Sequence, residues 1–208
     1  GTGKTFGFAL PIIQSMFDQN METETREKRQ YAKALVILPT RELAIQVAKD
    51  FEDVGVGLRC ICIYGGSPYA PQERALRNGI EIVIGTPGRL IDHLERGNLS
   101  LQDLQFLVLD EADEMLNMGF QDDVEKIMGH IPREQKIQKL LYSATVPTWV
   151  NKIAQKFMNN PQTIDLVTGT GTQASRGVKH LAVLCGWQDR ASVVADIVRV
   201  YGGTGKSL

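Results

Sequence analysis

The stretch FLVLDEAD, Phe106–Asp113, joins four apolar residues to a run of acidic and small ones. An apolar strand that ends in aspartate is typical of the second half of a P-loop nucleotide site, where the carboxylate holds Mg²⁺ directly or through water. On this interpretation Asp110 binds the metal, and Glu111 orients the attacking water or accepts its proton. The alternative is an acidic helix start, because Asp and Glu are favoured in the first turn of a helix.

A possible first half of the same site is GTGKT, Gly1–Thr5. In a phosphate-binding loop, backbone N–H groups cradle phosphate, the lysine reaches the terminal phosphates, and the threonine hydroxyl ligates Mg²⁺. The nucleotide-binding residues predicted in this way are Gly1, Thr2, Gly3, Lys4 and Thr5. Because the opening positions of the motif are missing, a glycine-rich turn with a solvated lysine is the alternative.

Around these two stretches, strand-like and helix-like patterns alternate along the chain. Short runs of Val, Ile and Leu suit strands that are covered on both faces. The predicted strands are Ala34–Leu38, Cys60–Tyr64, Glu81–Ile84, Phe106–Leu109 and Gln138–Tyr142. Helical stripes separate them, and Thr86-Pro87 offers an N-cap followed by proline at the first helical position. The alternation predicts an α/β fold with a mostly parallel sheet and helices on both sides.

Each predicted strand is followed by a short polar or glycine-rich segment. In chain order these segments are PTRELA (Pro39–Ala44), GG (Gly65-Gly66), TPGR (Thr86–Arg89), DEAD (Asp110–Asp113) and SAT (Ser143–Thr145). In a parallel sheet all five emerge at the carboxyl edge, where open α/β folds bind ligands. Taken singly, the arginines are also explained as surface charge at helix starts, and the glycine pair as an ordinary turn.

Together with GTGKT, these segments resemble the first RecA-like domain of a DEAD-box ATP-dependent RNA helicase, over Gly1 to about Asp165. The stretches YGGSPY (Tyr64–Tyr69), NGIEIVIGTPGR (Asn78–Arg89) and VKHLAVLC (Val178–Cys185) are similar to the nucleolar RNA helicase two (Gu) subgroup. The resemblance implies ATP and Mg²⁺ as cofactors and sequence-independent binding of RNA through its backbone.

The resemblance also implies a role for each matching residue. Lys4, Asp110 and Glu111 are the catalytic set, with Glu111 as the base and with Thr5 and Asp110 on the metal. One RNA strand is lined by Pro39, Thr40, Arg41, Gly65, Gly66, Thr86, Pro87, Gly88 and Arg89. Asp113 belongs to contacts between two domains, and Ser143 and Thr145 link the nucleotide state to strand separation.

The domain organisation that we predict is a piece of a longer protein, cut at both ends. Residues 1–166 form the first RecA-like domain without its first strand, 167–177 form a linker, and 178–208 hold the opening strand and helix of a second helicase domain. GTGKS, Gly203–Ser207, follows a helical pattern and is interpreted as a glycine-rich turn. Because the arginine finger belongs to the second domain, we expect this segment alone to be inactive.

The composition limits the partners. A net charge of −1 leaves RNA binding to a few local groups. No apolar run reaches the roughly 18 residues of a membrane span, so no membrane partner is expected. Three cysteines, Cys60, Cys62 and Cys185, are too few for a disulfide framework. Cys60 and Cys62 are expected to be buried free thiols, the alternative being metal ligands. The subgroup resemblance implies a nuclear or nucleolar location. Two other functions stay open, a fragment that binds RNA or a partner without hydrolysis and a P-loop ATPase that acts on DNA.

Overall fold

The computed structural model describes residues 3–22, 31–132, 134–165 and 181–202. The chain divides into two compact units, residues 1–162 and 163–208, and each is described by itself. The first unit holds β1 (Ala34–Ile37), β2 (Cys60–Ile63), β3 (Ile82–Gly85), β4 (Phe106–Leu109) and β5 (Gln138–Leu141). Its helices are α1 (Lys4–Glu22), α2 (Arg41–Val54), α3 (Tyr69–Arg77), α4 (Pro87–Glu95), α5 (Ala112–Asn117), α6 (Gln121–Gly129) and α7 (Thr148–Phe157).

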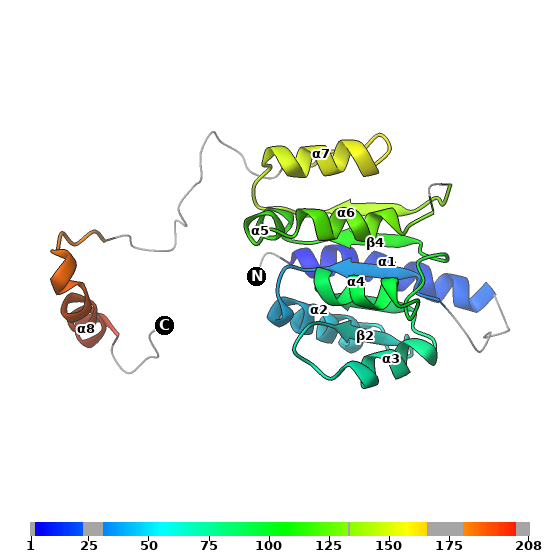
Figure 1. Cartoon of the computed structure of the whole chain (residues 1–208), viewed down its shortest axis with the longest axis horizontal. Coiled ribbons are helices and arrows are strands. Elements are labelled where there is room, and N and C mark those ends of the chain that lie inside the picture. The colour runs from blue at the N-terminus through cyan, green and yellow to red at the C-terminus, as the bar shows by residue number, and fades with distance from the viewer. Residues whose placement is uncertain (1–2, 23–30, 133, 166–180, 203–208) are drawn as a thin grey trace. The chain divides into compact units, whose positions relative to one another are not determined.

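The five strands form one parallel sheet in the order β2-β3-β1-β4-β5 (Figure 1). In the central register, Ala34 of β1 lies opposite Ile82 of β3 on one side and Phe106 of β4 on the other. Each of the five strands predicted for this unit is present within one residue of its expected ends. The predicted α/β class with a parallel sheet is therefore confirmed.

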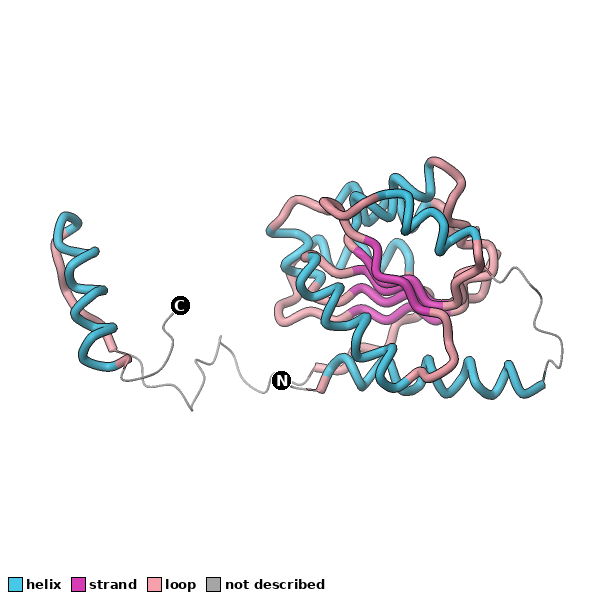
Figure 2. Tube along the Cα trace, turned by 90° about the horizontal axis from the view of Figure 1, so that it is seen from below, coloured by secondary structure: helices cyan, strands magenta, loops and turns pink. Residues whose placement is uncertain are grey.

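Side chains that alternate along the strands build two hydrophobic cores, one on each face of the sheet. Leu35 and Ile37 of β1 pack in the cluster that α4, α5, α6 and α7 cover. Ala34 and Val36 pack in the cluster that α1 and α2 cover. Figure 2 shows the strands lying between these two layers of helices. The inner strands β1 and β3 are buried along their whole length, which explains their uninterrupted apolar sequence.

The two cysteines of β2 lie on the α2 side of an edge strand. Both are free thiols, as expected, but they are half-buried where burial was expected. An edge strand has a neighbour on one side alone, and its side chains are less covered. Burial nevertheless raises the pKa of the Cys60 thiol to about 12 and that of Cys62 to about 11. Both thiols are therefore protonated and weakly nucleophilic at neutral pH.

The second unit contains the turn η1 (Trp187–Asp189) and α8 (Arg190–Tyr201), and α8 includes the helical stripe expected there. The expected strand at 178–185 is not present in its described part, because residues 181–185 join no ladder of the described strands. Leu181 and Leu184 are exposed, and an apolar run becomes a strand only when a neighbour pairs with its backbone. The predicted linker, 167–177, and the turn at 203–207 lie outside the described residues.

The charge of the stretch METETREKR, Met21–Arg29, predicts an exposed loop. The stretch begins inside α1, which continues through Glu22, and its other residues lie outside the described part of the chain. Within the described ranges, no helix has the length and hydropathy that crossing a membrane requires.

Candidate functional site

The carboxyl edge of the sheet carries the five polar segments that follow the strands. Because the strands are parallel, the residues that follow β1, β2, β3, β4 and β5 emerge at this one edge. Gly3, with a φ of +70°, immediately precedes α1, whose first turn holds an exposed Lys4 and a half-buried Thr5. Gly1 and Thr2 lie outside the described residues.

Asp110 and Glu111 form an acidic pair at the end of β4, which lies next to the central strand β1. Asp110 is 6% exposed, and its Oδ1 accepts a hydrogen bond of 2.9 Å from the Glu111 amide. Burial raises the pKa of Asp110 above its ordinary value, while the Glu111 amide and the positive charge of Lys4 act in the opposite direction. A buried carboxylate under these conditions is stabilised by a cation beside it.

The pKa of Glu111 is also raised, first by burial and then by the negative charge of Asp110, and Lys4 again opposes the shift. The charge of Lys4 therefore acts on both carboxylates, which places its side chain within electrostatic range of the pair. A raised carboxylate pKa suits a group that accepts a proton near neutral pH.

The backbone at Glu111 is in the left-handed region, with φ 53° and ψ 50°. For a residue with a side chain this conformation costs on the order of 1 kcal/mol or more, and such residues concentrate at functional sites. It lets the chain pass from β4 straight into α5, where the Ala112 amide donates a 3.0 Å hydrogen bond to the Tyr142 carbonyl. The strained residue is the one that the sequence predicts as the catalytic base.

Asp113 lies one helical position further on and binds the segment that follows β5. Its Oδ2 accepts hydrogen bonds of 2.9 Å from both the amide and the hydroxyl of Thr145, and the Asp113 amide donates to Ser143 Oγ at 3.2 Å. Burial acts to raise the pKa of Asp113, but these hydrogen bonds outweigh it and hold the pKa below its ordinary value. One hydrogen-bonded cluster therefore contains the three residues for which the resemblance implies a coupling role, Asp113, Ser143 and Thr145.

Two helix N-termini and a glycine turn complete the edge. Thr40 caps α2, its hydroxyl accepting from the Leu43 amide at 3.3 Å, and the Arg41 side chain is 61% exposed beside Glu42. Gly65 and Gly66 are exposed in the turn after β2. Helix N-termini and free backbone N–H groups of this kind bind phosphate groups.

Residues 86–89 begin α4 as the sequence predicts, with Thr86 before the helix and Pro87 at its first position. Thr86 occupies the N-cap position but its side chain makes no capping hydrogen bond, and Pro87 is buried while Gly88 is exposed. The Arg89 side chain is 14% exposed, far less than that of Arg41. Its guanidinium donates to the Ser67 carbonyl at 3.1 Å and to Gln72 Oε1 at 3.2 Å, so it is held by protein groups.

Sequence reasoning did not identify Gln72 as part of this edge. The residue lies in α3 and is 6% exposed, and its amide hydrogen-bonds the loop after β2 as well as α4. A glutamine in a helix is usually a surface residue, so no local signal in the sequence marks this one.

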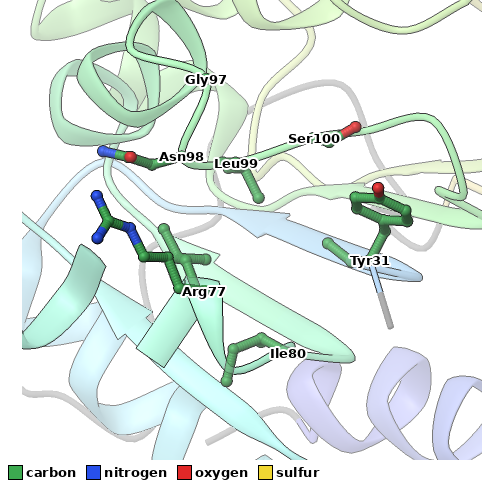
Figure 3. Close-up of a pocket in the computed structure, with 9 residues that line it drawn as sticks. Tyr31, Arg77, Ile80, Gly97, Asn98, Leu99 and Ser100 are labelled. Atoms are coloured by element: carbon green, nitrogen blue, oxygen red, sulfur yellow. The ribbon is translucent and has the colours of Figure 1, made fainter. Parts of the chain in front are cut away.

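A cavity of about 260 Å³ lies at the other edge of the sheet. Its lining includes Tyr31, Ile80 and Leu99, which lie shortly before β1, β3 and β4. Figure 3 shows Arg77 and Asn98 on one side of this cavity and Tyr31 on the other. None of the segments at the carboxyl edge lines it, so it is separate from the candidate site.

The chemistry of the carboxyl edge fits a magnesium ion. The described residues contain no cluster of three His, Cys, Asp or Glu side chains that could hold a metal. Mg²⁺, however, is commonly bound through one or two protein oxygens together with substrate phosphates and water. The Asp110 carboxylate and the Thr5 hydroxyl are hard oxygen ligands of the kind that it prefers.

Comparisons with known proteins place the chain among proteins of one kind. The model of the DEAD/DEAH box helicase family matches residues 1–153. The chain is 47% identical to DEAD-box ATP-dependent RNA helicase 7 of Oryza sativa subsp. japonica, over 100% of this chain and 30% of that protein. It is 45% identical to nucleolar RNA helicase 2 of Rattus norvegicus, over 98% of this chain and 26% of that protein.

A solved structure agrees with these matches. The crystal structure of a DEAD box protein from the hyperthermophile Methanococcus jannaschii has a TM-score of 0.66 and 43% sequence identity, over 77% of this chain and 41% of that one. The chain spans less than a third of the length of either curated relative.

Proposed function

The chain belongs to the DEAD/DEAH box helicase family, and from that premise we propose that it is the ATP-binding part of an ATP-dependent RNA helicase. The resemblance to DEAD-box RNA helicases that the sequence predicts is confirmed, with a nucleolar RNA helicase 2 among the relatives. The proposal depends above all on the acidic pair Asp110–Glu111 at the carboxyl edge. The positive charge of Lys4 acts on both carboxylates and opposes the rise in their pKa.

We propose that this edge binds the phosphates of ATP. Backbone N–H groups of Gly1, Thr2 and Gly3 hold phosphate oxygens, and Lys4 pairs with the terminal phosphates. Thr5 and Asp110 bind Mg²⁺, which neutralises charge that develops on the phosphates during hydrolysis. Support comes from the position of Lys4 at the start of α1 and from its electrostatic effect on Asp110.

Glu111 is the proposed general base of the hydrolysis. Its raised pKa makes the carboxylate a better proton acceptor than a solvated glutamate. The left-handed backbone conformation of Glu111 is strained, and strain of this kind concentrates at functional sites. The Asp113–Thr145 cluster is proposed to link the nucleotide site to β5 and, when a second domain closes, to that domain. The domain division predicted from the sequence, at 1–166, 167–177 and 178–208, remains part of this proposal.

One strand of RNA is proposed to lie along the remaining turns of the edge. The exposed Gly65, Gly66 and Gly88 and the half-buried Thr40 offer backbone N–H donors to phosphates. Arg41 adds an exposed guanidinium, which is paired with Glu42 at 2.7 Å. Pro39 and Pro87 are buried and shape the turns, and Thr86 and Arg89 contribute from half-buried positions. Such contacts read no bases, so the binding is independent of sequence. The names of the rice and rat relatives favour RNA over DNA as the substrate, and that of the rat protein supports a nucleolar location.

Steady-state hydrolysis by the complete protein that carries this chain tests the proposal. We expect ATP turnover to require Mg²⁺ and to rise at least about tenfold when single-stranded RNA is added, since the second domain completes the site on RNA. A single-stranded DNA of the same sequence is the control and is expected to stimulate less. Turnover of equal rate with and without RNA would contradict the proposed function.

A further inference from the structure

A buried polar network joins the turn after β2 to the start of α4. Its centre is the side-chain amide of Gln72, which is 6% exposed. Nε2 donates to the Tyr64 carbonyl at 3.3 Å and to the Ser67 hydroxyl. Oε1 accepts from the Arg89 guanidinium at 3.2 Å and from Nε2 of His93 at 3.1 Å. The side-chain amide of Gln72 therefore makes hydrogen bonds to both the turn after β2 and the first residues of α4.

The orientation of this amide is determined by its partners. Arginine donates hydrogen bonds and cannot accept them, so the Gln72 oxygen must face Arg89 and the nitrogen must face the carbonyl of Tyr64. His93 must then be the tautomer that carries its proton on Nε2. Nδ1 of His93 is buried and has no hydrogen-bond partner among the described residues, which agrees with a neutral ring.

Burial and nearby positive charges also keep the His93 ring neutral. Burial is the largest cause that lowers its pKa, and the positive charge of Arg89 adds to it, with a smaller contribution from Arg96. Asp92 and Glu73 act in the opposite direction but do not outweigh these effects. The network is thus assembled from one amide, one neutral imidazole and one guanidinium, with complementary donors and acceptors.

A second set of contacts holds the same two segments together. The ring of Tyr69, at the start of α3, stacks on His93 with centroids 4.4 Å apart and an interplanar angle of 15°. Asn98 donates to the Tyr69 hydroxyl at 2.9 Å, and the Arg89 and Arg96 guanidiniums lie over the ring at 5.4 and 4.9 Å. These contacts pack α3 against α4, and Gln72 lies within that contact.

Gln72 spans the two turns for which we propose phosphate contacts. The Gly65-Gly66 turn lies between its partners Tyr64 and Ser67, and Arg89 ends the TPGR segment. Two loops that follow different strands present N–H groups to neighbouring phosphates only if their separation is constant. A buried amide that binds both loops supplies that constraint.

We propose that Gln72 is a positioning residue for RNA: it sets the Gly65-Gly66 turn and the start of α4 at the separation that one nucleic-acid backbone requires. This inference rests on the proposed function. It assigns no contact between Gln72 and RNA, because the side chain is buried. The expected consequence of losing it is weaker RNA binding with unchanged ATP binding.

Two substitutions at this position test the inference in the complete protein. Gln72→Met keeps the length of the side chain and removes all four hydrogen bonds. Gln72→Glu keeps the acceptor for Arg89 and His93 and removes the donor to Tyr64 and Ser67. We expect Gln72→Met to raise the KM for a single-stranded RNA about tenfold, with kcat at saturating RNA and the KM for ATP within about twofold of wild type. Gln72→Glu is expected to recover part of the loss.

Gln155→Met, at an exposed position of α7, is the matched control and should leave all three constants unchanged. An unchanged KM for RNA in Gln72→Met would overturn the inference. So would an equal loss of ATP and RNA affinity, or a Gln72→Glu variant no better than Gln72→Met, because either result indicates a general loss of structure. Failure of the wild-type protein to respond to RNA would instead refute the proposed function, whatever the variants do.

Discussion

A Glu111→Gln variant of the complete protein is expected to lose RNA-stimulated ATP hydrolysis by a factor of about 100 to 10,000 while it still binds ATP. Glutamine has the size of glutamate but cannot accept a proton from water. The carboxylate of Glu111 lies beside Asp110 and has a raised pKa, as a general base working near neutral pH requires. The phosphate-binding groups and Asp110 are unchanged by the substitution, so affinity for the nucleotide should persist.

Steady-state turnover and the binding of a fluorescent ATP analogue together measure this separation of binding from hydrolysis. Glu95→Gln is the matched control, because Glu95 is exposed at the end of α4 and is not among the charges that shift the pKa of Glu111. Removal of its charge should leave both quantities near the wild-type values. Hydrolysis by Glu111→Gln at a rate close to wild type would exclude Glu111 as the base.

A Gly85→Ala substitution is expected to lower the free energy of unfolding by about 3 kcal/mol, or the Tm by roughly 10 °C. Gly85 ends β3, and a Cβ atom there would lie 2.4 Å from the backbone carbonyl oxygen of Ile63 in β2. Neither strand can yield without breaking the register that places the Gly65-Gly66 turn beside Thr86. The small residue is therefore required by the close approach of two backbones.

Denaturant unfolding of the 208-residue chain measures this effect. Gly129→Ala is the control, because its Cβ meets nothing within 4 Å and alanine favours the helix that ends there. That variant should be as stable as the wild type or slightly more stable. A Gly85→Ala chain that unfolds with the wild-type midpoint would show that the two strands can move apart at no cost.

The strands and the edge that carries the site could be predicted because their signals are local. A strand such as Ala34–Ile37, buried on both faces, must be apolar at every position, and the polar residues that follow it mark its carboxyl end. Parallel pairing then brings five such ends together without further information. Asp110 and Glu111 are therefore predictable from a strand end, and Lys4 from a glycine loop.

The parts that could not be predicted depend on partners far away in the chain. Gln72 and Arg89 are 17 residues apart, and their hydrogen bond exists only because α3 packs on α4. For the same reason the sequence left surface charge at a helix start open as the alternative for Arg89, whereas only 14% of its side chain is exposed. The strand expected at 178–185 is a second example, because its apolar pattern does not reveal whether a neighbouring strand is there to pair with it.

Lys4, Asp110 and Glu111 are proposed to belong to one nucleotide site, and an equilibrium titration with Mg²⁺ and a fluorescent ATP analogue tests whether they do. For the complete protein, Lys4→Ala is expected to weaken binding by a factor of about 10 to 100, because a charge-assisted contact to phosphate is lost. Lys49→Ala, at an exposed lysine of α2, should bind as the wild type does. Equal affinity of the Lys4→Ala variant and the wild type would contradict the claim.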